Sequence, residues 1–358
     1  MQPTIKHVSG PLAVALAGLF AGAACARAES SEGEAKTEAL ADADLALAGL
    51  ELYMRVTGIP GLLARTLRRQ PPRANARGEW HSGEGEYAGW FWRGNVSMDQ
   101  YANGLVPAVG LCRRLFPERA RRLAVAAATH LVENDFELTD PDGERTRFGD
   151  LSWRSGLGFN SIAQLTSYAI VSLAASLDAG EPRWRETRDR LRDRYRVIAR
   201  ARTTNLRVLG ITGHSNDLMA FDLYRVLLPL ALETNDPAAA DLRHGLFRSW
   251  LRVREDENAY FDLVFCSLEP RACDAEVLDR TRAQLAAFDS STSSGRPRLC
   301  TTSLVTTHSF TPWRDGISYM TSSITSSRIA RSPRAPEARR AASSAIERSA
   351  SGRKVSFT

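Results

Sequence analysis

The sequence predicts an all-α protein of helical hairpins, arranged as an α/α toroid, and two features lead to this fold class. Between Asp99 and Phe288, apolar helical segments alternate with charged ones, as expected when each buried helix pairs with an exposed partner. Each apolar segment also opens on a polar residue, at irregular spacing. Short solenoid repeats would be more regular. We therefore expect an inner ring of apolar helices inside an outer ring of charged ones, with a generic helical bundle as the alternative.

The individual elements follow from hydrophobic periodicity and turn residues. A first helix is expected over 45–68, with a break at the Gly-Ile-Pro-Gly sequence 58–61. The sequence DPDG at 140–143 is typical of a tight turn and predicts one small β-hairpin near 136–149. The other expected elements are apolar helices at 101–116, 158–177, 214–232 and 257–270, and charged helices at 118–133, 184–201, 236–253 and 274–288.

The polar openings of the apolar helices are the candidate site. Asp99, Asn160, Asn216 and Asn258 stand at these openings, separated by 61, 56 and 42 residues. In a toroid the inner helices begin at one end of the barrel, so their first-turn side chains converge around a central funnel. Aligned helix N-termini favour oxygen-rich or anionic groups. In a simple bundle the same residues would only cap their helices.

An aromatic loop precedes the first of these helices. Trp90 and Trp92 lie in this loop, and Gln100 and Tyr101 follow Asp99 at the start of the helix. Flat apolar rings beside carboxylate and amide groups are the mixture that sugar-like ligands need. We therefore expect Trp90, Trp92, Gln100 and Tyr101, together with the asparagines at 160, 216 and 258, to bind substrate.

Four segments resemble exported bacterial proteins with the six-hairpin glycosidase-like toroid: 92–100 (WRGNVSMDQ), 140–149 (DPDGERTRFG), 215–221 (SNDLMAF) and 257–261 (ENAYF). The resemblance extends from about Trp80 to Phe288. It implies a carbohydrate ligand, an oligo- or polysaccharide, and carboxylates on the funnel rim. Asp99 and Asp217 match those positions, where they would act as acid and base in glycoside cleavage.

The fold also carries lyases, epimerases and proteins without known activity. The alternative function is therefore a non-catalytic envelope binding protein or lipoprotein. Glu84 and Glu86 in the Gly-rich run are rival carboxylates, and Ser215 beside His214 has no nucleophile-elbow pattern. The run 83–89 lacks the lysine of a phosphate-binding loop. No cofactor is expected.

The N-terminus resembles an export signal. Lys6 and His7 precede an apolar run at 11–24, and Ala26-Arg27-Ala28 has the form of a cleavage site. We expect residues 1–28 to be removed on export to the periplasm or cell envelope, with residues 29–44 as an acidic linker. The alternative is that Cys25 carries a lipid anchor.

The cysteines of an exported protein meet an oxidising compartment. Cys266 and Cys273 bracket an expected helix–helix turn, so a local disulfide is predicted, whereas Cys112 on an apolar helix face is expected to be a buried free thiol. No Cys or His spacing typical of a metal site occurs in the sequence. We expect no metal.

The basic character of the chain belongs to its last 70 residues. The formal charge is +6, but residues 289–358 carry +7 and residues 1–288 carry −1. A nucleic-acid surface on residues 45–288, the expected toroid domain, is therefore not indicated. The tail at 289–358 also holds 26 Ser and Thr and little apolar periodicity, so it is expected not to complete the ring. It is either a disordered extension or the product of a frameshift near Phe288.

Overall fold

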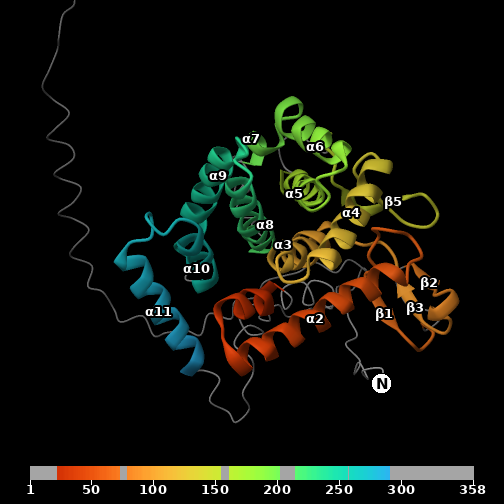
Figure 1. Cartoon of the computed structure of the whole chain (residues 1–358), viewed down its shortest axis with the longest axis horizontal. Helices are drawn as coiled ribbons and strands as arrows, with labels where there is room; N and C mark the ends of the chain where they lie inside the picture. Colours follow the sequence, from red (N-terminus) through yellow and green to blue (C-terminus); the bar gives the residue numbers. More distant parts are fainter. Residues whose placement is uncertain (1–21, 73–78, 155–160, 202–213, 257, 291–358) are drawn as a thin grey trace, which may run out of the picture. The chain divides into compact units, whose positions relative to one another are not determined.

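The computed structural model describes residues 22–72, 79–154, 161–201, 214–256 and 258–290 of the chain (Figure 1). These residues are mostly helical and include two small antiparallel sheets. Most of the expected export signal and the expected tail from residue 291 onward lie outside the described residues. The first half contains a helical stretch at 22–30, α2 (Gly33–Arg55), β1 (Thr66–Arg68), β2 (Trp80–Ser82), the 3₁₀ turn η1 (Gly85–Tyr87), β3 (Phe91–Arg93), the π-helix η2 (Gln100–Leu105), α3 (Val106–Cys112) and α4 (Pro117–Glu133).

The second half begins with a hairpin and continues as helices. Its elements are β4 (Glu137–Thr139), β5 (Arg145–Asp150), α5 (Ser161–Leu177), α6 (Pro182–Asp189), the π-helix η3 (Arg190–Arg194), α7 (Val197–Ala201), α8 (His214–Glu233), α9 (Ala238–Val253), α10 (Ala259–Leu268) and α11 (Ala275–Ser290).

The expected linker at 29–44 is mostly helical, which corrects that expectation. Helix α2 starts at Gly33 and buries Ala39, Ala43, Leu47 and Leu50, four residues that lie on one face. Alanine has the lowest intrinsic cost of entering a helix, which favours this segment as a helix. The first half of the buried stripe is built from alanine, so it gives a weak hydrophobic signal in the sequence.

The structure confirms the hairpin near 136–149 but adds a second sheet. In the hairpin, β4 pairs with β5, and the Gly143 N–H donates to the Asp140 carbonyl across the turn, with Gly143 at φ 81°. In the second sheet β3 lies between β1 and β2, with Trp92 opposite Leu67 and His81. Strands of three residues are too short to show a period of two, so the sequence predicted loops at β2 and β3. The expected helix over 45–68 is corrected as well, because α2 ends at Arg55 and β1 occupies Thr66–Arg68.

The expected alternation of buried and exposed helices is present in the described residues. Helix α5 buries 15 side chains, whereas the neighbouring α4, α6 and α9 carry their charges outward. Each of these charged helices contacts an apolar one: α4 contacts α3 and α5, α6 contacts α5, and α9 contacts α8. None of the described helices combines the length and apolar character needed to cross a bilayer.

The apolar helices α3 and α8 run in the same direction. A Cβ added at Gly110 in α3 would lie 2.4 Å from Val226 in α8, and further along both helices the Arg113 guanidinium bonds the Glu233 carboxylate at 2.6 Å. Contacts that advance together along both helices require a parallel arrangement. Helix α5 packs against both, and Ser176 near its end lines one small cavity with Thr234 after α8. The starts of η2 and α8 lie toward one end.

Candidate functional site

Asp99 lies where β3 leads into η2. Its side chain is half-buried, and its Oδ1 atom is buried without a hydrogen-bond partner among the described residues. It does not cap the helix. The Gln100 side chain instead accepts from the Ser97 N–H at 2.9 Å and donates to the Arg65 carbonyl at 3.3 Å. Buried carboxylate oxygens are nearly always hydrogen-bonded, so the unsatisfied Asp99 oxygen calls for a donor from elsewhere.

Asp217 lies in the first turn of α8 and is 4% exposed. The Arg252 guanidinium at the end of α9 approaches its carboxylate to 3.8 Å. Gly110 in α3 and Val226 in α8 face each other and mark one level along the two parallel helices. Asp99 stands 11 residues before Gly110, and Asp217 stands 9 residues before Val226. Both carboxylates therefore belong to the part of the chain before that level. They lie toward the same end of α3 and α8.

The predicted aromatic residues are mostly engaged by the protein itself. Trp92 is 2% exposed and stacks on His81 with ring centroids 4.2 Å apart. The Tyr101 hydroxyl accepts from the Leu63 N–H at 3.1 Å and donates to the Gly61 carbonyl at 2.9 Å. Both side chains therefore hold the sheet and the loop at 61–63 against η2.

Trp90 differs from these two because it is only half-buried. The Arg69 guanidinium lies 4.7 Å from its ring centroid. Its ring thus already stacks against a cation.

The three predicted asparagines do not form one group in the described residues. Asn160 lies outside them. Asn216 is exposed at the start of α8. Asn258 caps α10, because its side chain accepts from the Tyr260 N–H at 3.0 Å. The capping interpretation therefore accounts for Asn258.

One buried carboxyl was missed in the sequence. Asp222 lies in the middle of α8 with no exposed surface, and the Tyr260 hydroxyl at the start of α10 donates to its Oδ1. Burial raises the pKa of Asp222 to about 7, against the opposing effects of the Tyr260 hydrogen bond and the Arg225 charge. Its Oδ2 has no hydrogen-bond partner among the described residues. An acid inside an otherwise apolar helix was the signal that could have identified it.

A second group of ionisable residues lies at the sheet and hairpin. Burial raises the pKa of Asp140, and burial together with the negative charges of Asp140 and Asp142 raises the pKa of Glu79. The Asp140 carboxylate accepts from the Asn95 N–H at 2.7 Å, and the Asn95 side chain accepts from the Arg147 N–H at 2.8 Å. These paired bonds hold the loop before η2 against the β4–β5 hairpin. The group thus positions the segment that carries Asp99.

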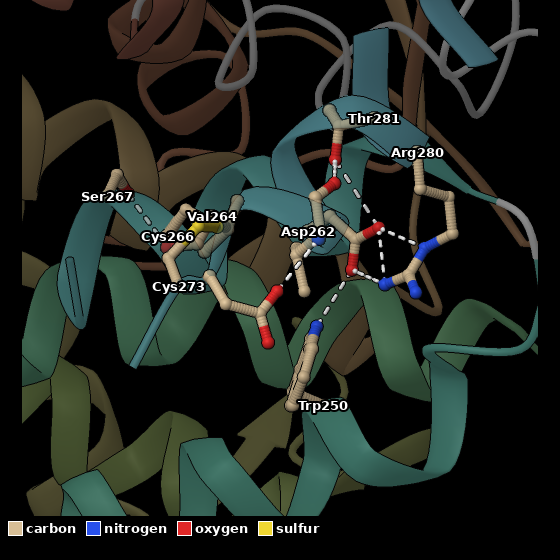
Figure 2. The surroundings of a disulfide bond; sticks show 10 residues. Trp250, Asp262, Val264, Cys266, Ser267, Cys273, Arg280 and Thr281 are labelled. Carbon is tan, nitrogen blue, oxygen red and sulfur yellow. Dashed lines mark hydrogen bonds and ion pairs between the residues drawn. A yellow bond between two sulfur atoms is a disulfide. The ribbon is translucent and has the colours of Figure 1, made fainter. Parts of the chain in front are cut away.

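The predicted disulfide between Cys266 and Cys273 is present (Figure 2). Close to it, the buried Asp262 carboxylate accepts from Trp250 Nε1 at 2.8 Å and from the Arg280 guanidinium at 3.0 Å. These bonds join α9, α10 and α11. Because every Asp262 oxygen has a partner, this buried acid stabilises the fold and is not free to bind a ligand.

Cys25 forms a disulfide with Cys112, so the prediction of a free Cys112 thiol is wrong. Both cysteines are completely buried, and their Cα atoms are 5.3 Å apart. The bond leaves no Cys25 thiol for lipid attachment. It also conflicts with cleavage after Ala28, because that cleavage would remove Cys25. The sequence could not reveal this pair, since its members stand 87 positions apart in the chain.

Glu84 and Glu86 are exposed in the loop around η1. In the described part of the chain, no group of three or more His, Cys, Asp or Glu side chains is arranged to hold a metal ion. No family model, curated protein or solved structure matches this chain.

Proposed function

We propose that this chain is an exported α/α toroid protein that binds, and in the enzymatic form of the proposal cleaves, a saccharide at the end where its apolar helices begin. The observation that carries the proposal is the buried, unpartnered Oδ1 of Asp99 at the same end as Asp217. Sugar hydroxyls are suitable donors for such an oxygen. The aligned N-termini of the parallel helices add a favourable field for oxygen-rich ligands.

The local backbone supports a ligand site at Asp99. The helix after it opens as a π-helix over Gln100–Leu105, all six residues of which are buried. Single π-helical turns are rare, and they occur frequently at functional sites. Asp99, which precedes this turn, itself has helical backbone angles (φ −60°, ψ −31°), and its side chain makes no cap hydrogen bond.

The toroid form of the proposal rests on the parallel apolar helices and their charged partners. Helix α3 contacts both α5 and α8, so these three helices pack on one another and do not surround a wide lumen. We therefore place the saccharide at the rim of this end and not in a deep channel. In the enzymatic form Asp99 and Asp217 are the acid and base, and the Arg252 guanidinium lies 3.8 Å from the Asp217 carboxylate.

Export is supported by the Cys266–Cys273 disulfide, whose two cysteines lie outside the expected export signal. Disulfides persist in the periplasm and at cell surfaces and are rare in the cytosol.

A non-catalytic saccharide-binding protein is the second candidate. It is favoured by the burial of Asp217, which is only 4% exposed and lies 3.8 Å from the Arg252 guanidinium. A catalytic carboxyl has to reach the scissile bond, and little of this one is open to solvent.

A panel of oligosaccharides tests both forms. Calorimetry detects binding, and chromatography of the products detects cleavage. We expect Asp99→Asn to weaken binding at least about tenfold, because it removes a charged acceptor. The control Asp279→Asn changes an acid that is 72% exposed in α11 and should leave binding unchanged. Equal binding by wild type and Asp99→Asn, or no binding by the wild type, would exclude this site.

A further inference from the structure

A pocket of about 540 Å³ has a lining whose chemistry differs from that of the Asp99 end. Its walls are the end of α2, the turn at 58–60, η1 and the middle of α4. Pockets of this size are in the range that holds small organic ligands. Neither Asp99 nor Asp217 contributes to its lining.

The more buried part of the pocket lining is apolar, and the exposed part, its rim, is charged. Met54, Ile59, Leu123 and Ala126 supply apolar surface, and the Tyr87 ring adds to it. Four charged side chains complete the lining: Glu51, Arg55, Glu86 and Arg122.

Three of the four charges have partners. Glu51 accepts from Arg119 at 2.8 Å and from Arg122 at 3.2 Å. Glu86 accepts a hydrogen bond from Tyr87. Arg55 is exposed in the last turn of α2, and no carboxylate of the described residues lies within ion-pair distance of it. Arg55 is thus the rim charge left to meet a ligand.

The walls are held by the protein before any ligand binds. The Thr57 hydroxyl donates to the Met54 carbonyl at 2.7 Å and accepts from the Ile59 N–H at 3.1 Å, which fixes the turn after α2. Gly61 follows at φ 86°, and a Cβ there would lie 2.2 Å from the Ala126 carbonyl. This close approach joins the turn to α4. A preformed pocket avoids the entropic cost of ordering loops on binding.

We infer that this pocket binds a small amphipathic monoanion whose aromatic or aliphatic body fills the apolar floor and whose carboxylate pairs with Arg55. The apolar lining favours a ligand with an apolar body, because binding removes that body from water. The guanidinium selects the anion, because its planar fork matches the two oxygens of a carboxylate. The already paired Glu51 and Glu86 leave no free acid to attract a cation. This inference is independent of the saccharide site.

The test uses two ligands with the same apolar body, 4-phenylbutyrate and the neutral 4-phenylbutanol, measured by calorimetry on the full-length protein. We expect the acid to bind with a Kd of roughly 1 mM or below. The alcohol should bind about three- to tenfold more weakly, because it lacks the ion pair. Equal affinities, or no binding of the acid, would overturn the inference.

Two variants locate the site. Arg55→Gln should abolish the difference between acid and alcohol, whereas Arg185→Gln, an exposed arginine in α6, should preserve it. Ala126→Phe should fill the pocket and weaken the binding of both ligands. Thermal melting checks that this variant is folded. The inference fails if Arg55→Gln retains the preference for the acid. Because Arg55 is exposed, this variant is expected to fold even if Ala126→Phe does not.

Discussion

Cys25 and Cys112 form a buried disulfide that ties the helical stretch at 22–30 to the end of α3. Ala24 and Ala28 on the same stretch are buried as well. The segment that the sequence assigns to the end of an export signal is thus packed into the core. Either this segment remains in the mature protein, or cleavage removes a covalent part of the fold.

The first prediction is that the mature protein retains Cys25. Peptide mapping without reduction should recover a peptide in which Cys25 and Cys112 are linked. Reduction should separate it into two peptides. A mature N-terminus at residue 29 would contradict this prediction and would support cleavage after Ala28.

The same disulfide should contribute more stability than the Cys266–Cys273 bond. The sequence separations are 87 and 7 residues, so the chain-entropy estimates are about 4.6 and about 2.4 kcal/mol. The double variant Cys25→Ser, Cys112→Ser should therefore lower the free energy of unfolding more than Cys266→Ser, Cys273→Ser. Denaturant titration measures both. Equal losses would contradict the larger contribution that the longer loop predicts for the Cys25–Cys112 bond.

His130 should make stability fall at acidic pH. Burial lowers its pKa to about 4, and its Nε2 accepts from the Thr139 N–H at 3.3 Å. Between pH 6.5 and 4 the unfolded chain binds a proton that the folded protein does not, so the free energy of unfolding decreases as pH falls, by about 3 kcal/mol in total. His130→Gln should reduce this loss in denaturant titrations at pH 4 to 7. The exposed His244→Gln is the control.

Asp222 should make the free energy of unfolding fall as the pH rises, opposite to the effect of His130. Its pKa is raised from 3.8 to about 7, so the folded protein holds a proton that the unfolded chain releases. The stabilisation is fully present below pH 3.8 and is lost as pH rises through 7, on the order of 4 kcal/mol in total. Asp222→Asn cannot titrate and should remove this pH dependence between pH 5 and 8, whereas Asp279→Asn should not. An unchanged pH profile in Asp222→Asn would show that this carboxyl is not the source.

Gly61 and Gly58 provide a matched pair of substitutions in the turn after α2. Both have positive φ, 86° and 70°, so an alanine at either position costs about 1 to 2 kcal/mol of backbone strain. Only at Gly61 would the new Cβ collide with the Ala126 carbonyl, whereas nothing lies within 4 Å at Gly58. Gly61→Ala should therefore lower the melting temperature more than Gly58→Ala. Similar melting temperatures would contradict the close approach of the turn to α4.

The sequence by itself determined the helical class, the alternation of buried and exposed helices, the β4–β5 hairpin and the Cys266–Cys273 disulfide. Each of these depends on residues that are near one another in the chain. Helical periodicity repeats within a few residues, the DPDG turn fixes its own backbone, and six residues separate the paired cysteines. Local patterns of this kind can be recognised in the sequence without knowledge of the tertiary structure.

Only the tertiary structure decided which distant residues meet. Three such contacts join segments that are far apart in the chain or too short to show a pattern. They are the Cys25–Cys112 disulfide, the Tyr260–Asp222 hydrogen bond and the pairing of β3 with β1 and β2. The engagement of Tyr101 by the loop at 61–63 is of the same kind. Burial and long-range packing set these contacts, and with them the pKa values of the ionisable groups, because desolvation depends on the surroundings and not on the neighbours in sequence.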